Sequence, residues 1–261
     1  MKRFALIGET LAHSYSVPIH ETLFSLMGLK DTYFLKEIDR ETFHTDVMEL
    51  LTRIDGMNVT IPYKQRIIPL LSAMDPLAER VGAVNTVVKK DGAWIGCNTD
   101  VYGFMKMLRM HSIDPKGMPC FILGTGGASR AVYVALEEMQ AACITYVSRT
   151  PGDHALSYDA LPDVFDGLLV NCTPVGMYPH GDGCPLAPGA LKAMLPRMQG
   201  CADLIYNPSD TRLTAFCRAH GVPACTGLGM LVAQAVQAER FWQDIPIPPD
   251  MTQQILKEWK P

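Results

Sequence analysis

The segment at residues 121–130 has residue types and a spacing suited to holding a pyrophosphate. An apolar run that ends in Gly124 predicts a buried strand, a glycine turn follows, and residues 128–139 predict a helix. A strand, a tight turn and a helix N-terminus in this order present backbone N–H groups to a phosphate. Ser129 stands where the G-x-G-x-x-G pattern has its last glycine, so the segment alone also fits an ordinary strand-to-helix turn.

A second group of polar residues lies in the loop at residues 13–16. Ser14 and Ser16 stand between a predicted strand and a predicted helix. Their hydroxyls, the free N–H groups and the helix dipole can hold a carboxylate there. Taken alone, Ser16 is more simply interpreted as a helix N-cap.

Further polar side chains stand at the ends of predicted strands. Asn58 and Thr60 lie on one face of a strand, and Lys64 follows it closely. Ligands bind at the carboxyl ends of parallel strands. A lysine there can donate or accept a proton, although most lysines are solvated surface charges. Asn85 and Asp100 follow later in the chain, and Asp100 also fits an N-cap of the next helix.

Apolar periodicity predicts the elements that position these residues in the first hundred positions. We expect strands at 3–7, 33–38, 57–60, 83–88 and 93–96, and helices at 18–28, 41–54 and 63–72. The dipeptide Asp91-Gly92 predicts a hairpin turn between the last two strands. This part is therefore expected to be an α/β unit with mostly parallel strands and one antiparallel hairpin.

The remainder of the chain alternates between strand and helix patterns. We expect helices at 102–110, 128–139, 230–242 and 251–259, and strands at 120–123, 144–147, 168–170, 202–205 and 222–225. This alternation predicts a second, parallel sheet. The predicted fold class is α/β with two domains.

Composition excludes several classes of function. The 261 residues are 48% hydrophobic and 19% charged, with a net charge of −4, which provides no general attraction to nucleic acid or an anionic membrane. The N-terminal apolar run is too short for a signal peptide, and no segment approaches a membrane span. The eight cysteines form no C-x-x-C pair and the seven histidines are scattered. We therefore expect no metal and a reducing, cytoplasmic location.

Five segments, taken together, resemble the motif series of the shikimate dehydrogenase family. They are residues 58–64 (NVTIPYK), 82–86 (GAVNT), 98–100 (NTD), 124–130 (GTGGASR) and 227–235 (GLGMLVAQA), in the family's order over nearly the whole chain. The resemblance implies an NADP-dependent oxidoreductase that reversibly reduces 3-dehydroshikimate to shikimate, a step toward chorismate and the aromatic amino acids.

The resemblance also implies the site residues. Lys64 and Asp100 are the expected catalytic pair, in which Lys64 exchanges the proton and Asp100 orients it and binds a substrate hydroxyl. Ser14 and Ser16 are expected to hold the substrate carboxylate. The other expected substrate contacts are Thr60, Asn85, Tyr206 and Gln234. The expected cofactor contacts are Gly124, Thr125, Gly126, Gly127, Ala128, Ser148, Arg149, Thr150, Leu204, Gly227 and Met230.

The family pattern further implies a discontinuous N-terminal domain. We expect residues 1–100 with 226–261 to form an α/β substrate-binding and catalytic domain with a mostly parallel sheet. Residues 101–225 would form a Rossmann-like NADP-binding domain. The chain is expected to be a monomer or a homodimer.

The cofactor's adenosine end is where this sequence departs from the family. Arg149 ends the second strand of the cofactor domain, where an arginine accommodates the 2′-phosphate of NADP and an acidic residue would favour NAD. Asp153 stands where the family often has a second basic residue, and its charge would oppose the phosphate. Before Asn171 there is room for at most a very short crossover helix. NADP is favoured, and NAD remains the alternative.

Three other functions remain open. A quinate/shikimate or aminoshikimate dehydrogenase has the same motifs, but serine at both 14 and 16 favours shikimate over quinate. A non-catalytic dinucleotide-binding sensor would have no need of both Lys64 and Asp100.

Overall fold

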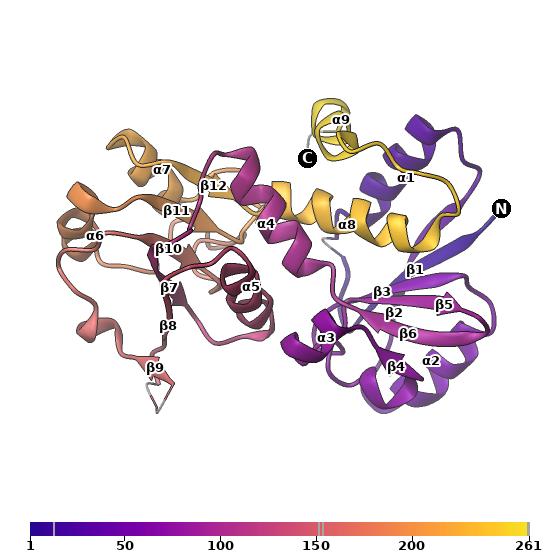
Figure 1. Ribbon diagram of the computed structural model, residues 1–261. Helices are drawn as coiled ribbons and strands as arrows, with labels where there is room; N and C mark the ends of the chain where they lie inside the picture. Colours follow the sequence, from indigo (N-terminus) through magenta and orange to yellow (C-terminus); the bar gives the residue numbers. More distant parts are fainter. Residues whose placement is uncertain (13, 151, 153, 260–261) are drawn as a thin grey trace. The chain divides into compact units, whose positions relative to one another are not determined.

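The computed structural model describes residues 1–12, 14–150, 152 and 154–259 (Figure 1). It divides into two compact units, Met1–Tyr102 with Val232–Pro261, and Gly103–Leu231. Each unit contains one six-stranded sheet with helices packed on it. The predicted α/β fold class is confirmed.

The first unit is built on a mixed sheet. Its strands are β1 (Arg3–Gly8), β2 (Thr32–Glu37), β3 (Gly56–Val59), β4 (Ala73–Met74), β5 (Thr86–Lys90) and β6 (Ala93–Cys97), in the order β2-β1-β3-β5-β6-β4. Its helices are α1 (Ser16–Met27), α2 (Phe43–Leu51), α3 (Pro76–Val81) and α9 (Met251–Glu258), while α4 (Asp100–Met110) and α8 (Leu228–Trp242) belong partly to each unit. Among these strands only β5 runs antiparallel to its neighbours, so the predicted hairpin with β6 is confirmed.

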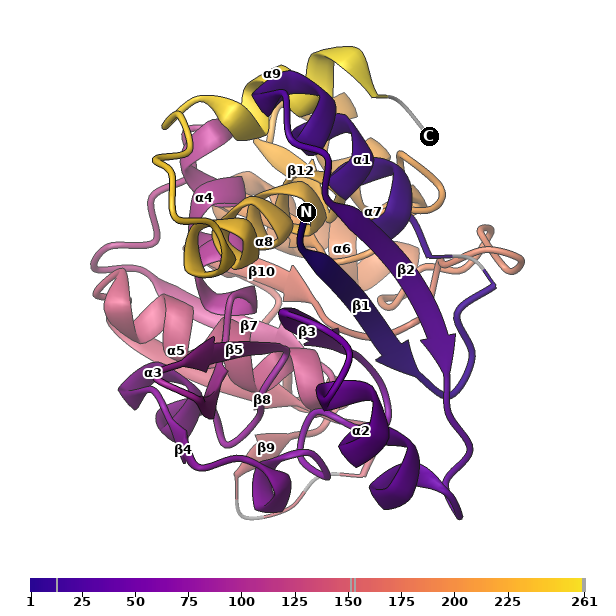
Figure 2. The same cartoon turned by 90° about the vertical axis from the view of Figure 1, so that its right-hand side faces the viewer.

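Both faces of this sheet are covered, which explains the continuous apolar run of β1. Ala5 and Ile7 pack in the cluster that contains Phe43 of α2. Phe4 points to the other face and stacks on Trp242 of α8, with ring centroids 4.6 Å apart. Figure 2 shows α1 and α8 over one face and α2 and α3 over the other. Burial on both faces is typical of parallel strands between layers of helices.

One predicted helix of the first unit is wrong. Residues 63–72 form turns and a single 3-10 turn, η1 (Ile68–Leu70), instead of a helix. Pro69 has no N–H group to continue a helix. The backbone after it pairs with β6 instead, since Ser72 donates to the carbonyl of Trp94 and β4 joins the edge of the sheet.

The second unit has an entirely parallel sheet. Its strands are β7 (Pro119–Leu123), β8 (Cys143–Val147), β9 (Ala155–Leu156), β10 (Leu168–Asn171), β11 (Gly200–Asp203) and β12 (Ala224–Thr226), in the order β12-β11-β10-β7-β8-β9. The strand order reverses between β7 and β10, which is the Rossmann-like arrangement that binds ligands at the reversal.

Helices cover both faces of the second sheet. α6 (Pro188–Met194), the 3-10 turn η3 (Leu195–Arg197) and α7 (Arg212–Ala219) pack on one face, and α5 (Gly127–Glu138) covers the other (Figure 1). Between β8 and β10 the described chain forms only β9 and the 3-10 turn η2 (Tyr158–Ala160). The prediction of at most a very short crossover helix is therefore confirmed. In the described ranges no helix is long and apolar enough to cross a membrane.

Candidate active site

Lys64 and Asp100 form an ion pair in the first unit. Lys64 Nζ lies 2.7 Å from Asp100 Oδ2, and their side chains are 19% and 11% exposed. Lys64 follows β3, and its carbonyl accepts a hydrogen bond from Val84 N at 2.7 Å, just before β5. Asp100 is the first residue of α4. Two segments distant in the sequence thus bring a cation and an anion together in a largely shielded position.

Asn85 holds the other oxygen of this carboxylate. Its Nδ2 donates to Asp100 Oδ1 at 2.9 Å and to Thr99 Oγ1 at 2.9 Å. Its Oδ1 accepts from Thr99 N at 2.7 Å, and the residue is only 3% exposed. Each carboxylate oxygen therefore has a partner of its own, which fixes the orientation of Asp100. The simpler N-cap interpretation of Asp100 does not describe these contacts.

Gln234 belongs to the same cluster. Thr99 Oγ1 donates to Gln234 Oε1 at 3.3 Å, which joins α8 to the start of α4. Thr60 is half-buried at the end of β3, where its N–H donates to the carbonyl of Ile7. Thr99 is not among the predicted site residues, although its position beside Asp100 within the Asn-Thr-Asp segment was a signal for it.

The serine loop of the first unit is organised by its own hydroxyls. Ser14 Oγ donates to Ser16 Oγ at 3.2 Å and accepts from Ser16 N at 3.2 Å. The helix starts at Ser16 with Tyr15 as its N-cap residue, so the N-cap interpretation of Ser16 and the helix start at Pro18 are wrong. His13, the first residue of this predicted loop, lies outside the described residues.

The glycine turn of the second unit forms an open cradle at the reversal of strand order. Gly124 has φ +96°, and a Cβ there would lie 3.0 Å from Thr173 Cγ2. Gly126 is the N-cap residue of α5 and makes no side-chain capping bond. A Cβ on Gly126 or Gly127 would meet nothing within 4 Å. Thr125 and both of these glycines are exposed, and Ala128 is half-buried.

This cradle fits a diphosphate. The first N–H groups of a helix have no partners within it, and the helix dipole favours an anion there. The first turn of α5 holds no acidic residue that would oppose such a group. The donors come from the backbone, so the glycines serve mainly to leave their approach clear.

The predicted residues for the adenosine end follow β8. Arg149 is exposed, and Thr150 N donates to Ser148 Oγ at 3.2 Å. Ser148 N donates to the carbonyl of Leu156 at 2.9 Å, which ties this end to β9. Pro151 and Asp153 lie outside the described residues, so the predicted opposition of Asp153 to a phosphate stays a prediction.

Leu204 and Gly227 meet at the carboxyl end of β11. A Cβ on Gly227 would lie 2.0 Å from the carbonyl oxygen of Leu204, so only glycine allows this approach. Met230 follows in α8 and is buried, and Tyr206 is half-buried. Both belong to the second unit.

A buried carboxylate supports this turn. Asp203 accepts hydrogen bonds from Ile205 N at 3.1 Å, Asn171 Nδ2 at 3.0 Å and Thr211 Oγ1 at 2.8 Å. Burial raises the pKa of Asp203, and these three donors act in the opposite direction. The carboxylate thus joins β10, β11 and the start of α7 beneath the segment that carries Tyr206.

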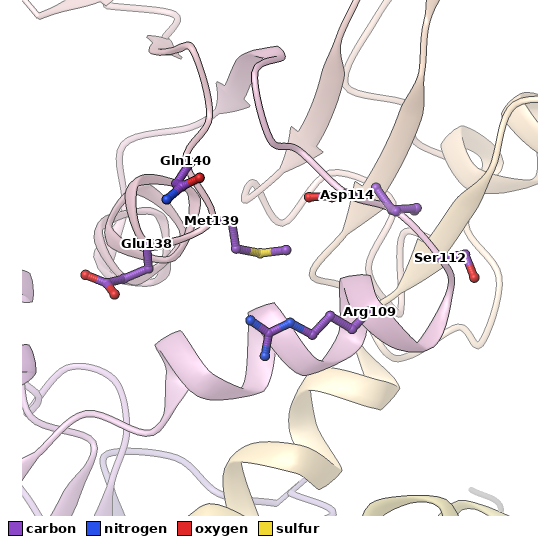
Figure 3. A pocket seen from close by; sticks show the side chains of 7 residues that line it. Arg109, Ser112, Asp114, Glu138, Met139 and Gln140 are labelled. Atoms are coloured by element: carbon purple, nitrogen blue, oxygen red, sulfur yellow. The ribbon is translucent and has the colours of Figure 1, made fainter.

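A cavity of about 430 Å³ lies elsewhere in the second unit. Figure 3 shows Arg109 of α4 together with Glu138 and Met139 at the end of α5 around it. None of the predicted site residues lines it. Within the described ranges, no three His, Cys, Asp or Glu side chains are grouped so that they could hold a metal ion.

Comparison with known proteins shows which family this chain belongs to. The profile of the shikimate dehydrogenase substrate binding domain matches residues 6–87. A shikimate dehydrogenase (NADP(+)) of Clostridium perfringens (strain SM101 / Type A) is 35% identical over 273 residues, which covers 100% of this chain and 99% of the relative. This chain belongs to the shikimate dehydrogenase family. The resemblance predicted from the five motifs is confirmed.

Solved structures of the family agree in fold. A chorismate mutase/shikimate 5-dehydrogenase fusion protein from Clostridium acetobutylicum has a TM-score of 0.92 and 36% identity, covering 99% of this chain and 97% of that one. A shikimate 5-dehydrogenase from Thermus thermophilus, solved in complex with NADP(H) and shikimate, has a TM-score of 0.87 and 31% identity, covering 99% of both chains.

Proposed function

We propose that this protein is an NADP-dependent shikimate dehydrogenase in which Lys64 and Asp100 are the catalytic pair. The observation that carries the proposal is the 2.7 Å ion pair between them, in a chain that matches shikimate dehydrogenases over its full length. A lysine with an anionic partner and limited exposure is suited to exchanging a proton with a substrate oxygen.

Bound NADPH would supply the hydride for the carbonyl carbon of 3-dehydroshikimate. Lys64 Nζ would donate a proton to the carbonyl oxygen during reduction and accept it from the hydroxyl during oxidation. Asp100 Oδ2 holds that ammonium group at 2.7 Å, and Asn85 keeps the carboxylate from rotating. The carboxylate also has the acceptor capacity to bind a substrate hydroxyl next to the reacting one.

The remaining substrate contacts follow from the chemistry of shikimate. The hydroxyls of Ser14 and Ser16 would bind its carboxylate, near the start of α1, where the helix dipole favours an anion. The other proposed contacts to the ring and its hydroxyls are Thr60, Asn85, Gln234 and Tyr206. Serine at both 14 and 16 favours shikimate over quinate. The weaker alternatives are an aminoshikimate dehydrogenase and a non-catalytic dinucleotide-binding sensor. The sensor is the weaker proposal because a binding protein would have no need of the Lys64–Asp100 pair.

The cofactor would bind to the second unit. The cradle at Gly124–Ala128 would hold the diphosphate, and Ser148, Arg149 and Thr150 would contact the adenosine end. Leu204, Gly227 and Met230 would lie near the nicotinamide. The first unit would then be the discontinuous substrate and catalytic domain, as expected for residues 1–100 with 226–261. Residues 101–225 would be the NADP-binding domain.

We further propose a cytoplasmic enzyme that is a monomer or a homodimer. All eight cysteines are free thiols, which supports a reducing compartment. The net charge of −4 supports a small-molecule substrate over nucleic acid.

Lys64→Ala is expected to reduce kcat for shikimate oxidation by at least about 100-fold, because it removes the group that exchanges the proton. The rate is measured as NADPH formation with saturating shikimate and NADP. Lys30→Ala, which removes an exposed lysine of the same unit, is the control and should keep the wild-type rate. A Lys64→Ala enzyme with near-normal kcat would contradict the proposed role.

Gly126→Val tests the diphosphate cradle. Gly126 has φ −74°, which valine adopts without strain, and its added Cβ meets no protein atom. The variant should therefore fold normally, while KM for NADP rises by about tenfold or more because the side chain occupies the ligand's place. Gly189→Val, at an equally open glycine in the first turn of α6, is the matched control. If Gly126→Val and Gly189→Val have the same KM for NADP, the diphosphate does not bind at the glycine turn.

Arg149→Ala tests the choice of cofactor. Only NADP carries a 2′-phosphate, so KM for NADP should rise by about tenfold while KM for NAD changes by less than about twofold. Both constants come from the same preparation, which makes NAD the internal control. If KM for NADP and KM for NAD rise by the same factor, Arg149 does not contact the 2′-phosphate.

A further inference from the structure

Thr86 is a fully buried residue of β5 whose hydroxyl lies between two buried amide side chains. It faces Asn58 of β3 across the antiparallel pair of strands. Asn58 Nδ2 donates to Thr86 Oγ1 at 3.0 Å, and Thr86 Oγ1 donates to Asn85 Oδ1 at 3.1 Å. Thr99 Oγ1 lies 3.1 Å from Thr86 Oγ1 as well, but its proton is directed to Gln234 Oε1. The Thr86 hydroxyl therefore receives a bond from Asn58 and gives its only proton to Asn85.

Backbone groups that can bond in one way only fix the direction of these bonds. Asn58 Nδ2 also donates to the carbonyl of Asn85 at 3.1 Å, and a carbonyl only accepts, so this end of the Asn58 amide is the nitrogen. Thr99 N donates to Asn85 Oδ1 at 2.7 Å, and an N–H group only donates, so this end of the Asn85 amide is the oxygen. Asn85 Nδ2 is thereby turned toward Asp100 Oδ1, which lies 2.9 Å away.

Asn58 is held at its other end as well. The hydroxyl of Tyr33 donates to Asn58 Oδ1 at 2.8 Å, and Asn58 is only 5% exposed. A buried amide with partners at both ends cannot rotate without leaving polar atoms unsatisfied, which costs free energy. Asn58 is therefore a fixed donor to the hydroxyl of Thr86.

We infer that Thr86 is a positioning residue that, with Asn58 as its support, holds the Asn85 amide against the Asp100 carboxylate. The inference rests on the proposed function, in which Asp100 belongs to the catalytic pair. Asp100 Oδ2 binds Lys64 and Oδ1 binds Asn85, so a displaced Asn85 amide would leave the carboxylate free to rotate. The Thr86 hydroxyl donates to Asn85, so its effect on Asp100 passes through that amide.

The test compares Thr86→Val with Thr86→Ser. Valine keeps the branched shape and replaces the hydroxyl by a methyl group, so kcat/KM for shikimate should fall by about tenfold or more. Serine keeps the hydroxyl and loses the methyl group, so kcat/KM should stay within about twofold of wild type. Thr86→Ala is a second variant without the hydroxyl and should show the same fall as Thr86→Val. A normal valine variant with an impaired serine variant would indicate packing alone and overturn the inference.

Two controls separate positioning from a general loss of stability. Thr252→Val, at a buried threonine of α9 in the same unit, should keep the wild-type kcat/KM. The Kd for NADP of Thr86→Val, measured without shikimate, should stay within about twofold of wild type, because the proposed cradle belongs to the other unit.

A double-mutant comparison tests the route through Asn85. Asn85→Ala should lower kcat/KM, and adding Thr86→Val to it should lower kcat/KM by less than about twofold more. Independent, multiplying effects would overturn the inference.

A ligand-free crystal structure of Thr86→Val tests the same point without turnover. Asn85 Nδ2 should have moved beyond hydrogen-bond distance of Asp100 Oδ1. An amide that keeps this bond would overturn the inference, whereas a wild-type protein that does not oxidise shikimate would show that the proposed function has failed.

Discussion

The first unit depends on keeping one ammonium and one carboxylate paired while both are largely shielded from water. Shielding charges costs free energy unless each is matched by a partner and by further hydrogen bonds. Lys64 and Asp100 meet this condition, since they pair at 2.7 Å and the second carboxylate oxygen binds Asn85. Lys64 lies a few residues after β3, Asn85 directly precedes β5, and Asp100 begins α4. The fold of the first unit therefore has to bring three segments of the chain to one place.

The second unit is suited to bind an anion with backbone groups instead of charged side chains. A diphosphate needs many donors and no competing side chains, and a glycine turn at a helix N-terminus supplies them from the backbone. Gly124 is packed against Thr173 and Cys172, while Gly126 and Gly127 face open space. The first unit therefore positions its charged groups with a buried network of side chains. The glycine turn of the second unit instead leaves its backbone N–H groups accessible because its glycines have no side chains. This contrast explains why substitutions at Gly126 and at Lys64 should affect different kinetic constants.

Local sequence patterns predicted the structural features that depend on residues close together in the chain. The glycine turn, the Asp91-Gly92 hairpin and the alternation of strands and helices all carry local signals, and all are present in the structure. The helix over residues 63–72 is wrong because a distant strand, β6, bonds the backbone after Pro69. The helix α3 was missed, although Asp75 caps it and Gly82 ends it at φ +66°.

The activity proposed for this protein is the NADP-dependent oxidation of shikimate, in preference to quinate, at the site that contains Lys64 and Asp100. The most direct measurement is the steady-state rate of NADPH formation by the wild-type protein with shikimate, and with quinate in parallel. We expect turnover of shikimate with NADP at a kcat/KM at least about tenfold above that for quinate. A protein that binds NADP but oxidises neither acid, or that prefers quinate, would contradict it.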